Sequence, residues 1–475
     1  MSALHELSTA DQLRGLRGHD FTARALAEHY LDRIDRLDGE LGAFITVDPE
    51  LALRDADRAD EQLARDVHTP LGGIPIGIKD LHATAGLATS FGSKPLAGSM
   101  PTDDAWTVGL IRDAGAVLLG KTNAPEFGVA CYIDDGVAPV PAVTPFDTRR
   151  YSSGSSGGAA TAVASGLLPL AHASDGAGST RTPAATCHLV GVKPSRGLVS
   201  LAPAGSFFAT GVEGPLARTV EDAALLLEVM ARGPVGDLYH WRSDVDLAEA
   251  GRDRPHGRLK IAWWTDTGFD DVDPHPEAIR AVRRTVELLR ELGHEVIEIA
   301  PPARYDEVTA RAVRDMLAIS AAMNTAAMVP HDKRDQLTAH TRHLAATGEA
   351  MTGADVLTMQ AVLARYATKF LTAFDDFDFA LTPTTSGPPV PVGHFESEGI
   401  EHVSQRMIEW SCYTPWANLT GQPAIALPSH LDDDGLPYSI QLIGRVRQDA
   451  ALLSLAAQLE HEGLWEAVHP PQWYR

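Results

Sequence analysis

The chain has few cysteines, few lysines and less positive than negative charge. Its 475 residues include three cysteines, Cys131, Cys187 and Cys412, and no CxxC pair, which argues against a disulfide framework or a cysteine-based zinc site. There are 40 Lys and Arg residues against 63 Asp and Glu, a formal net charge of −23. Such a surface repels phosphate backbones and anionic lipids, so neither nucleic acid nor a membrane is an expected partner.

Long apolar runs are missing as well. No stretch of 18 apolar residues occurs, and the first residues lack the apolar core of a signal peptide. The sequence therefore predicts a cytoplasmic protein. Only seven of the 40 basic residues are lysines, so a lysine inside an apolar run stands out. The oligomeric state stays open, with a homodimer as one expectation.

The distribution of apolar residues predicts one large α/β domain over residues 1–475, and not a string of smaller domains. Residues 1–66 are expected to be helical, residues 67–230 to form a core of short buried strands, and residues 301–375 to form a more variable helical insertion. No linker or internal repeat separates these segments. Individual elements are expected as helices at 8–36, 49–66, 159–164, 220–230, 276–292 and 448–463, and as strands at 74–78, 116–119, 259–266 and 295–299. Residues 378–393 are expected to form a strand that runs into a proline-rich loop, and the segments 418–429 and 438–444 return to the apolar style of the core.

The first chemical signal is the segment GGIPIGIKD, residues 72–80. Lys79 ends an apolar, strand-like run, where an ammonium group is poorly solvated. Desolvation lowers the pKa of a lysine and can leave a neutral amine that accepts protons near pH 7. The simpler interpretation is a lysine that reaches solvent from a strand end or pairs with Asp80.

Two further signals are loops rich in small residues. In SSGSSGGAATAVASG, residues 152–166, a Gly/Ser loop leads into a helix whose free N–H groups suit a phosphate or an oxyanion. In ASDGAGSTRTPAATC, residues 173–187, Ser179 follows three small residues that can form a nest of N–H groups. We expect Asp175 and Arg181 to pair across this second loop. Each loop alone is equally compatible with an ordinary turn.

Other motifs carry less weight. The letters GxxxxGKT occur in GAVLLGKT, residues 115–122, but the intervening residues are apolar and strand-like, which does not suit a phosphate-binding loop. The letters GxSxG around Ser156 lack the apolar strand that precedes a nucleophile elbow. His340 and His343 share a helix face without a third ligand, so no metal site is expected.

Taken together, these segments resemble the amidase signature family of serine hydrolases. GGIPIGIKD, GKTNAPEFG, the stretch from about Gly154 to Pro194, GPLARTVEDA, LTPT and NLTGQPAIALP all match blocks of that family. The resemblance covers nearly the whole chain and is weakest over residues 301–375. The phrase AHASDGAGS resembles most the branch that contains nylon-oligomer cyclic-dimer hydrolases.

The resemblance implies an α/β/α sandwich with a central mixed sheet, and it implies a Ser–cis-Ser–Lys triad. Ser179 matches the nucleophile, Ser155 the bridging serine at a cis peptide bond, and Lys79 the base. Ser156 is the runner-up serine and, with Asp175 and Arg181, is expected to support the site. The oxyanion hole is expected from four backbone N–H groups, those of Gly176, Ala177, Gly178 and Ser179, and a substrate pocket from Cys131, Tyr132, Phe207 and Trp416.

Two departures from the family pattern bear on the site. Ala177 stands where the family usually has glycine, and Ser153 stands where glycine is also common. Both keep the triad intact, but the segment between residues 129 and 153 is divergent and is expected near the mouth of the site.

The expected activity is hydrolysis of a small linear or cyclic carboxamide through a seryl acyl-enzyme, with no metal or organic cofactor. Two alternatives use the same serine chemistry. One is hydrolysis of a carbamate or ester, or acyl transfer, on the same triad. The other is the glutamine-hydrolysing subunit of a tRNA-dependent amidotransferase.

Overall fold

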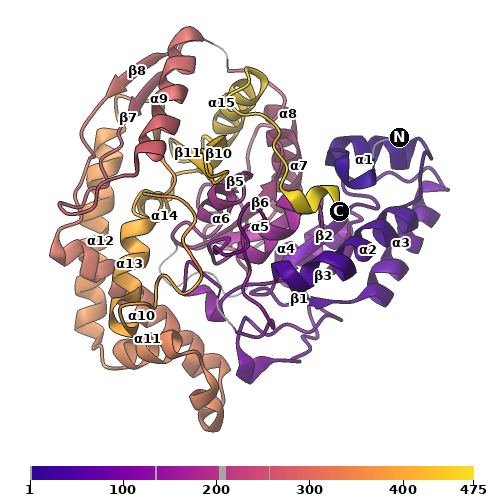
Figure 1. The fold of residues 1–475 in the computed structure, drawn as a ribbon, viewed down its shortest axis with the longest axis horizontal. Helices are drawn as coiled ribbons and strands as arrows, with labels where there is room; N and C mark the ends of the chain where they lie inside the picture. The colour runs from indigo at the N-terminus through magenta and orange to yellow at the C-terminus, as the bar shows by residue number, and fades with distance from the viewer. Residues whose placement is uncertain (1–2, 134–135, 203–209, 256) are drawn as a thin grey trace.

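One mixed sheet of eleven strands runs through the protein, in the order β1-β3-β2-β4-β6-β5-β10-β11-β9-β7-β8 (Figure 1). The computed structural model describes residues 3–133, 136–202, 210–255 and 257–475. The strands are β1 (Phe44–Val47), β2 (Pro75–Lys79), β3 (Val117–Thr122), β4 (Leu170–Asp175), β5 (Val190–Lys193), β6 (Val212–Ala217), β7 (Lys260–Trp263), β8 (Glu295–Glu298), β9 (Phe379–Pro383), β10 (Ala424–Leu431) and β11 (Pro437–Gly444).

Parallel and antiparallel pairs alternate in blocks along this sheet. Strand β2 is parallel to both β3 and β4, whereas β4–β6, β6–β5, β5–β10 and β10–β11 are antiparallel. Strand β7 is again parallel to β8 and β9. The mixed α/β sheet expected from the sequence is therefore confirmed.

Helices cover both faces of the sheet. They are α1 (Thr9–Arg17), α2 (Ala23–Leu41), α3 (Pro49–Leu63), α4 (Trp106–Asp113), α5 (Gly157–Ala164), α6 (Arg181–Thr186), α7 (Val220–Met230), α8 (Leu247–Ala250), α9 (Pro276–Glu291), α10 (Glu307–Met328), α11 (Ala339–Glu349), α12 (Gly353–Ala373), α13 (Val403–Trp410), α14 (Pro415–Thr420) and α15 (Asp449–His461). Alternate residues of β9 separate the two layers: Phe379 and Leu381 join the large core that includes α7, α9 and α15, and Ala380 joins a second core with α10 and α12.

The N-terminal helical segment differs from the expectation in one respect. A single helix was predicted over residues 8–36, but the structure has α1 and α2 with a break between them. Gly18 ends α1, and Thr22 begins α2 by accepting a hydrogen bond from the Ala25 N–H group. A glycine followed three or four residues later by a capping threonine is the sequence signal for such a break.

Segments far apart in the chain lie side by side at the edges of the molecule. Helices α10, α12 and α13 gather on one side of Figure 1, and α1 to α3 lie on the opposite side. The two ends of the chain meet there, since His5 Nε2 lies 3.0 Å from the Trp473 carbonyl oxygen. None of the helices in the described part of the chain combines the length and apolar character that crossing a bilayer requires.

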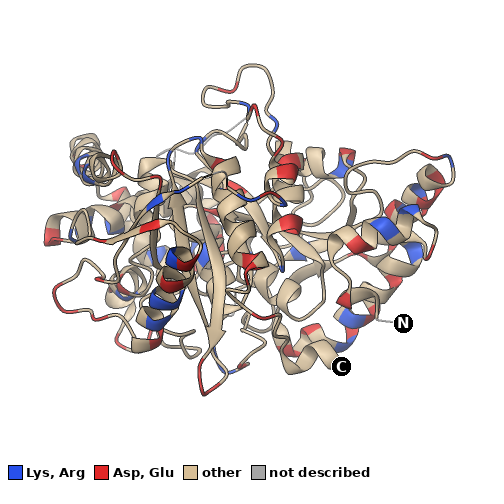
Figure 2. Ribbon diagram, turned by 90° about the horizontal axis from the view of Figure 1, so that it is seen from above, with Lys and Arg blue, Asp and Glu red and all other residues tan. Residues whose placement is uncertain are grey.

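Most charged side chains lie at the surface, but a few, among them Lys79, Lys121, Asp175, Arg181 and Lys193, are buried. Figure 2 shows Lys, Arg, Asp and Glu mainly on the outer helices and loops, while the central strands are almost free of them. Lys79, at 0% exposure, is therefore an exception that needs a chemical reason.

Candidate active site

Lys79 is the last residue of β2 and is enclosed by its neighbours in the sheet. Its Nζ atom lies 2.7 Å from Ser155 Oγ and donates to the Ser174 carbonyl oxygen at 3.1 Å and to Ser174 Oγ at 3.0 Å. Burial lowers the pKa of Lys79 from 10.5 to about 7, although the carboxylates of Asp175 and Glu213 act in the opposite direction. A neutral amine is therefore well populated at neutral pH.

Ser155 lies in the Gly/Ser loop that leads into α5. The peptide bond between Gly154 and Ser155 is cis, as the family resemblance predicted. The Ser155 side chain is buried, at 3% exposure, and Gly128 lies so close that a Cβ there would be 3.3 Å from Ser155 Oγ. Ser155 thus sits between the buried lysine and the more open part of the site.

Ser179 lies in the loop between β4 and α6. It is partly exposed, unlike Lys79 and Ser155, and it lines a cavity of about 250 Å³. The two serine loops are joined by a hydrogen bond from the Ser156 N–H group to the Ser179 carbonyl oxygen at 3.1 Å. The Ser156 hydroxyl donates to the Ser174 carbonyl oxygen at 3.1 Å, so it is engaged with β4.

An ion pair fixes the shape of the Ser179 loop. Arg181 Nε and Nη2 donate to the two carboxylate oxygens of Asp175 at 3.0 and 2.9 Å, and both residues are fully buried. Asn418 joins the pair: it donates from Nδ2 to Asp175 Oδ1 at 2.9 Å and accepts from Arg181 at 2.6 Å. Burial opposes the charged carboxylate, but Arg181 holds the pKa of Asp175 well below its ordinary range. The expected pairing of Asp175 with Arg181 is therefore present.

The backbone N–H groups of the loop do not all point to a substrate. The Gly178 N–H group donates to Asp175 Oδ1 at 2.7 Å, so the expectation that it contributes to an oxyanion hole is wrong. The N–H groups of Gly176, Ala177 and Ser179 have no hydrogen-bond partner within the described part of the chain. These three groups are the available donors beside the Ser179 side chain.

Two residues of the site, Ala177 and Ser153, depart from the family pattern, and their backbone conformations differ. Ala177 has no positive φ, so alanine fits where the family usually has glycine. The strict requirement falls on Gly178, whose φ is +128° and where a Cβ would lie 2.2 Å from Thr414 Oγ1. Ser153 has a φ of +66°, a conformation that favours glycine, and its hydroxyl donates to Thr182 Oγ1 at 3.0 Å.

The cavity in front of Ser179 is lined without a charged side chain among the described residues. Its walls include the following residues from the two serine loops, the divergent segment, α10 and α13: Phe127, Gly128, Val129, Ala130, Cys131, Gly154, Gly176, Ala177, Gly178, Ser179, Thr182, Thr210, Gly211, Val313, Met316, Leu317, Ser320, Asn324, Met407, Ile408, Ser411 and Pro415. Such a lining suits an uncharged ligand with an apolar part.

Of the three expected pocket residues that the structure describes, Cys131 alone lines this cavity. Tyr132 is 1% exposed and stacks on Phe395 with ring centroids 5.2 Å apart. Trp416 is 2% exposed and stacks on Phe370 at 4.3 Å, so it belongs to the core behind α14. The expectation is therefore wrong for both, because burying a large aromatic side chain in a packed core stabilises the fold more than leaving it at a cavity wall. The fourth residue, 207, lies outside the described residues.

Comparison with known proteins gives the same picture over the whole chain. The sequence profile of the amidase family matches residues 25–453. The chain belongs to the amidase family. A putative amidase of Mycobacterium tuberculosis, AmiB2, is 37% identical over 467 residues, which are 97% of each chain, and an acylamidase of Rhodococcus erythropolis is 32% identical over 98% of each. The solved structure of a 6-aminohexanoate cyclic dimer hydrolase with substrate superposes with a TM-score of 0.90 at 27% identity, over 99% of this chain and 100% of that one.

This amidase is therefore an enzyme that hydrolyses the carbon–nitrogen bond of a carboxamide.

Helix α10 of the amidase, within the weakly matching insertion, contributes five residues to the cavity wall. Met316 is one of them. Met323, by contrast, is 43% exposed and does not line the cavity. Helical spacing alone does not distinguish these positions, because it does not show which face of α10 meets the serine loops.

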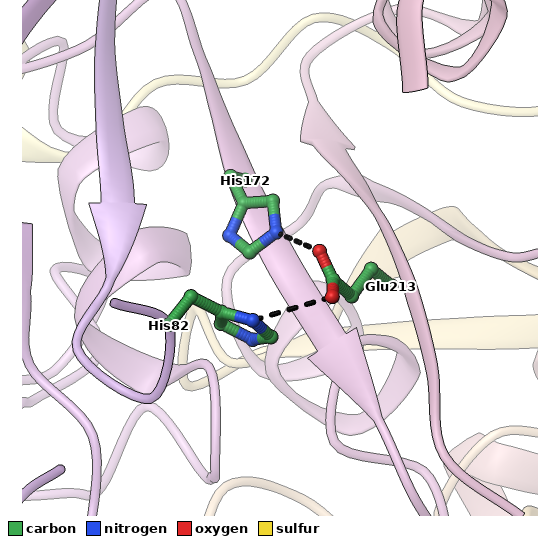
Figure 3. Close-up of side chains that lie close together, drawn as sticks. All are labelled: His82, His172 and Glu213. Carbon is green, nitrogen blue, oxygen red and sulfur yellow. Dashed lines mark hydrogen bonds and ion pairs between the residues drawn. The ribbon is translucent and has the colours of Figure 1, made fainter. Parts of the chain in front are cut away.

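The amidase also has a polar cluster that sequence reasoning did not find. His82, His172 and Glu213 form the one group of three His, Cys, Asp or Glu residues in the described structure that is close enough to hold a metal ion (Figure 3). His172 Nε2 lies 2.7 Å from Glu213 Oε2, and His82 Nδ1 lies 3.3 Å from Glu213 Oε1. Nothing in the sequence connects these three residues, because they lie far apart along the chain. His340 and His343, which share a helix face, are not part of any such group among the described residues.

Proposed function

We propose that Lys79, Ser155 and Ser179 are the catalytic residues and that hydrolysis proceeds through an acyl-enzyme on Ser179. The observation that carries this proposal is the 2.7 Å contact of Lys79 Nζ with Ser155 Oγ, because Gly154, the neighbour of Ser155, lines the same cavity as Ser179. A serine hydroxyl is a weak nucleophile and needs an adjacent base. Lys79, with its pKa lowered by burial to about 7, is a suitable base because a substantial fraction of it is neutral at pH 7.

The reaction requires two proton transfers in sequence. Ser179 Oγ attacks the amide carbonyl carbon and passes its proton to Ser155 Oγ, while Ser155 passes its own to Lys79 Nζ. Collapse of the tetrahedral intermediate breaks the C–N bond, and the same two serine-to-lysine steps run backwards to protonate the departing amine. Water then attacks the acyl-enzyme by the same route and releases the acid.

The negative oxygen of each tetrahedral intermediate is placed near the free N–H groups of the loop. Gly176, Ala177 and Ser179 supply these donors, and the Gly178 N–H group instead holds Asp175. Removing one such donor typically costs about 10²–10³ in kcat. The Asp175–Arg181 pair therefore acts through the loop shape, because both side chains are occupied with each other and with Asn418.

The substrate proposed is a small uncharged carboxamide with an apolar acyl group. The cavity of about 250 Å³ and its lack of charged lining among the described residues support this class. Free glutamine is less suitable, because its α-ammonium and α-carboxylate groups both need charged partners when they leave water. Carbamates, esters and acyl transfer to another amine use the same acyl-enzyme, so they remain side activities of the proposed triad.

A panel of amides that differ in acyl length, aromaticity and charge tests this proposal. Purified protein should turn over neutral amides without a partner subunit, and intact-mass and peptide mapping should locate a slow-turnover acyl adduct on Ser179. Ser179→Ala should lose the adduct and the activity, while Ser156→Ala is the matched control in the same loop and should keep the adduct. An adduct on Ser156, or activity on glutamine with partner proteins alone, would contradict the proposal.

Location and partners belong to the same proposal. The three cysteines are free, and the net charge of −23 opposes contact with nucleic acid or anionic lipid, which supports a cytoplasmic enzyme of small molecules. Size-exclusion chromatography with light scattering tests the expected homodimer.

A further inference from the structure

The His82–Glu213–His172 cluster lies next to the proposed base. The three residues come from the turn after β2, from β4 and from β6, and these strands are neighbours in the sheet. The backbone N–H group of His82 donates to the backbone carbonyl oxygen of Lys79 at 3.2 Å. Glu213 is paired in register with Ser174, the residue whose hydroxyl and carbonyl oxygens accept hydrogen bonds from Lys79 Nζ.

The composition of this cluster is that of a transition-metal ligand set, but its surroundings do not favour a cation. A histidine that binds a metal nearly always donates its other ring N–H group to an acceptor. Here His82 Nε2 and His172 Nδ1 are buried and have no hydrogen-bond partner in the described structure. Lys121 also donates to the His82 carbonyl oxygen, which brings a second lysine close to the cluster.

The cluster instead has the geometry of a carboxylate held by two imidazoles. Figure 3 shows both rings directed at the carboxylate of Glu213. Burial disfavours the charged form of Glu213, but His82 and His172 hold its pKa well below its ordinary range, so it is ionised. Burial also lowers the pKa of His172 to about 4, so this ring is neutral at pH 7 and does not cancel the charge.

The groups that act on Lys79 are few. Asp175 on β4 and Glu213 on β6 are the two carboxylates that favour its protonated form. Asp175 is already paired with Arg181, whereas Asp80 is 3.8 Å from Lys121. His172 on β4 and His82 after β2 complete the titratable groups around the cluster. Among the described residues, no arginine or lysine side chain forms an ion pair with Glu213, and its partners are the two histidines. Its negative charge is therefore available to act on Lys79.

We propose that Glu213, held between His82 and His172, is a positioning residue whose buried charge stabilises the Lys79 ammonium formed when Ser155 transfers its proton. The inference rests on the proposed role of Lys79 as the base. In each half of the reaction Lys79 becomes a buried cation, and a fixed carboxylate close by lowers the free energy of that state. Glu213 touches neither substrate nor the reacting serines, so it acts through Lys79 alone.

Glu213→Gln is the decisive variant because it removes the charge and keeps the shape. The acid limb of the pH profile of kcat/KM should move to lower pH by roughly one unit, and the plateau should fall about tenfold or more, since a weaker base transfers protons more slowly. Glu213→Asp keeps the charge and should keep the limb near its wild-type position. Asp222→Asn is a matched control, since Asp222 is an equally buried carboxylate that accepts hydrogen bonds from the Thr9 and Ala10 N–H groups.

NMR of isotope-labelled lysine gives a direct readout, because the chain has only seven lysines and Lys79 can be assigned from Lys79→Met. The titration of Lys79 should move to lower pH in Glu213→Gln. His82→Arg is a second variant for the case that Glu213→Gln does not fold: His82 is partly exposed, and a guanidinium there would cancel the Glu213 charge and move the limb in the same direction.

A folded Glu213→Gln or His82→Arg protein with an unchanged acid limb and Lys79 titration would overturn the inference. So would one equivalent of a transition metal in the wild-type protein that Glu213→Gln loses, since the cluster would then be a metal site. These results are separate from a failure of the proposed function, in which Lys79→Met itself would retain turnover.

Discussion

Lys79 Nζ lies 2.7 Å from Ser155 Oγ, and neither side chain reaches solvent. In the proposed mechanism this pair takes up the proton of Ser179, which is partly exposed. A lysine in this place serves as a base only when it is neutral, and burial is what makes it neutral near pH 7.

Replacing Lys79 by Arg should reduce kcat/KM by at least about 10³-fold, because arginine keeps the positive charge but cannot give up its proton. In the wild-type enzyme, kcat/KM should fall about tenfold per pH unit below pH 7, as Lys79 becomes protonated. Initial rates across pH 5–9 provide the measurement. A flat profile down to about pH 5 would contradict a neutral-lysine base.

Lys193 offers the control for this experiment. Its burial lowers its pKa to about 7 as well, but its Nζ donates to the Pro194 carbonyl oxygen and to neither serine of the triad. Lys193→Met should therefore retain the acid limb. If Lys193→Met lost the acid limb while Lys79→Arg stayed active, the base would be Lys193 and not Lys79.

Adding a methyl group at Gly178 should impair catalysis, whereas removing the methyl group of Ala177 should have little effect. Gly178→Ala should reduce kcat by about 10²-fold or more, because the new Cβ would lie 2.2 Å from Thr414 Oγ1 and the φ of +128° disfavours alanine. Ala177→Gly should stay within about threefold of wild type, since its N–H group is retained. Steady-state kinetics with thermal melts would show whether the loss is local; equal effects at both positions would refute this account.

Asp175→Asn should destabilise the fold by about 3–5 kcal/mol, because it leaves the Arg181 guanidinium buried without its counter-charge. The pKa of Asp175 is lower in the folded than in the unfolded protein. Its contribution to stability is therefore present above about pH 4 and is lost as the pH falls through the folded-state pKa. Urea unfolding at pH 7 of the variant and the wild type measures the difference, and a change below about 1 kcal/mol would contradict a buried pair that depends on both charges.

The sequence was a good guide where the signal is local. The end of β2 at Lys79 and the helix Val220–Met230 were predicted from apolar runs and their bounding residues, and the structure has them in place. The loop of Ser155 and that of Ser179 were found because small residues are required wherever the backbone passes closely, as at Gly178.

The remaining features depend on contacts between distant segments. Glu213 approaches His172 only because β6 pairs with β4, and nothing near residue 213 in the sequence indicates a partner 41 residues away. The pocket wall was misjudged for a similar reason. Large aromatic residues were expected there, but Trp416 is buried in the core. Helix α10 instead contributes five smaller side chains to the wall, and which of its faces meets the cavity depends on tertiary packing.

Helix α10 should therefore control which acyl groups the enzyme accepts. Leu317 lines the cavity in front of Ser179, so Leu317→Trp should fill part of its volume of about 250 Å³. We expect kcat/KM for amides with long or aromatic acyl groups to fall by about tenfold to a hundredfold, and that for short acyl groups to change little, because each methylene that no longer fits costs about 1–3 kcal/mol. Met323→Trp is the matched control on the same helix, since Met323 is 43% exposed and does not line the cavity. Competition between a short and a long amide in one assay gives the ratio of kcat/KM directly. A ratio that Leu317→Trp leaves unchanged, or that Met323→Trp changes equally, would show that the acyl group binds away from α10.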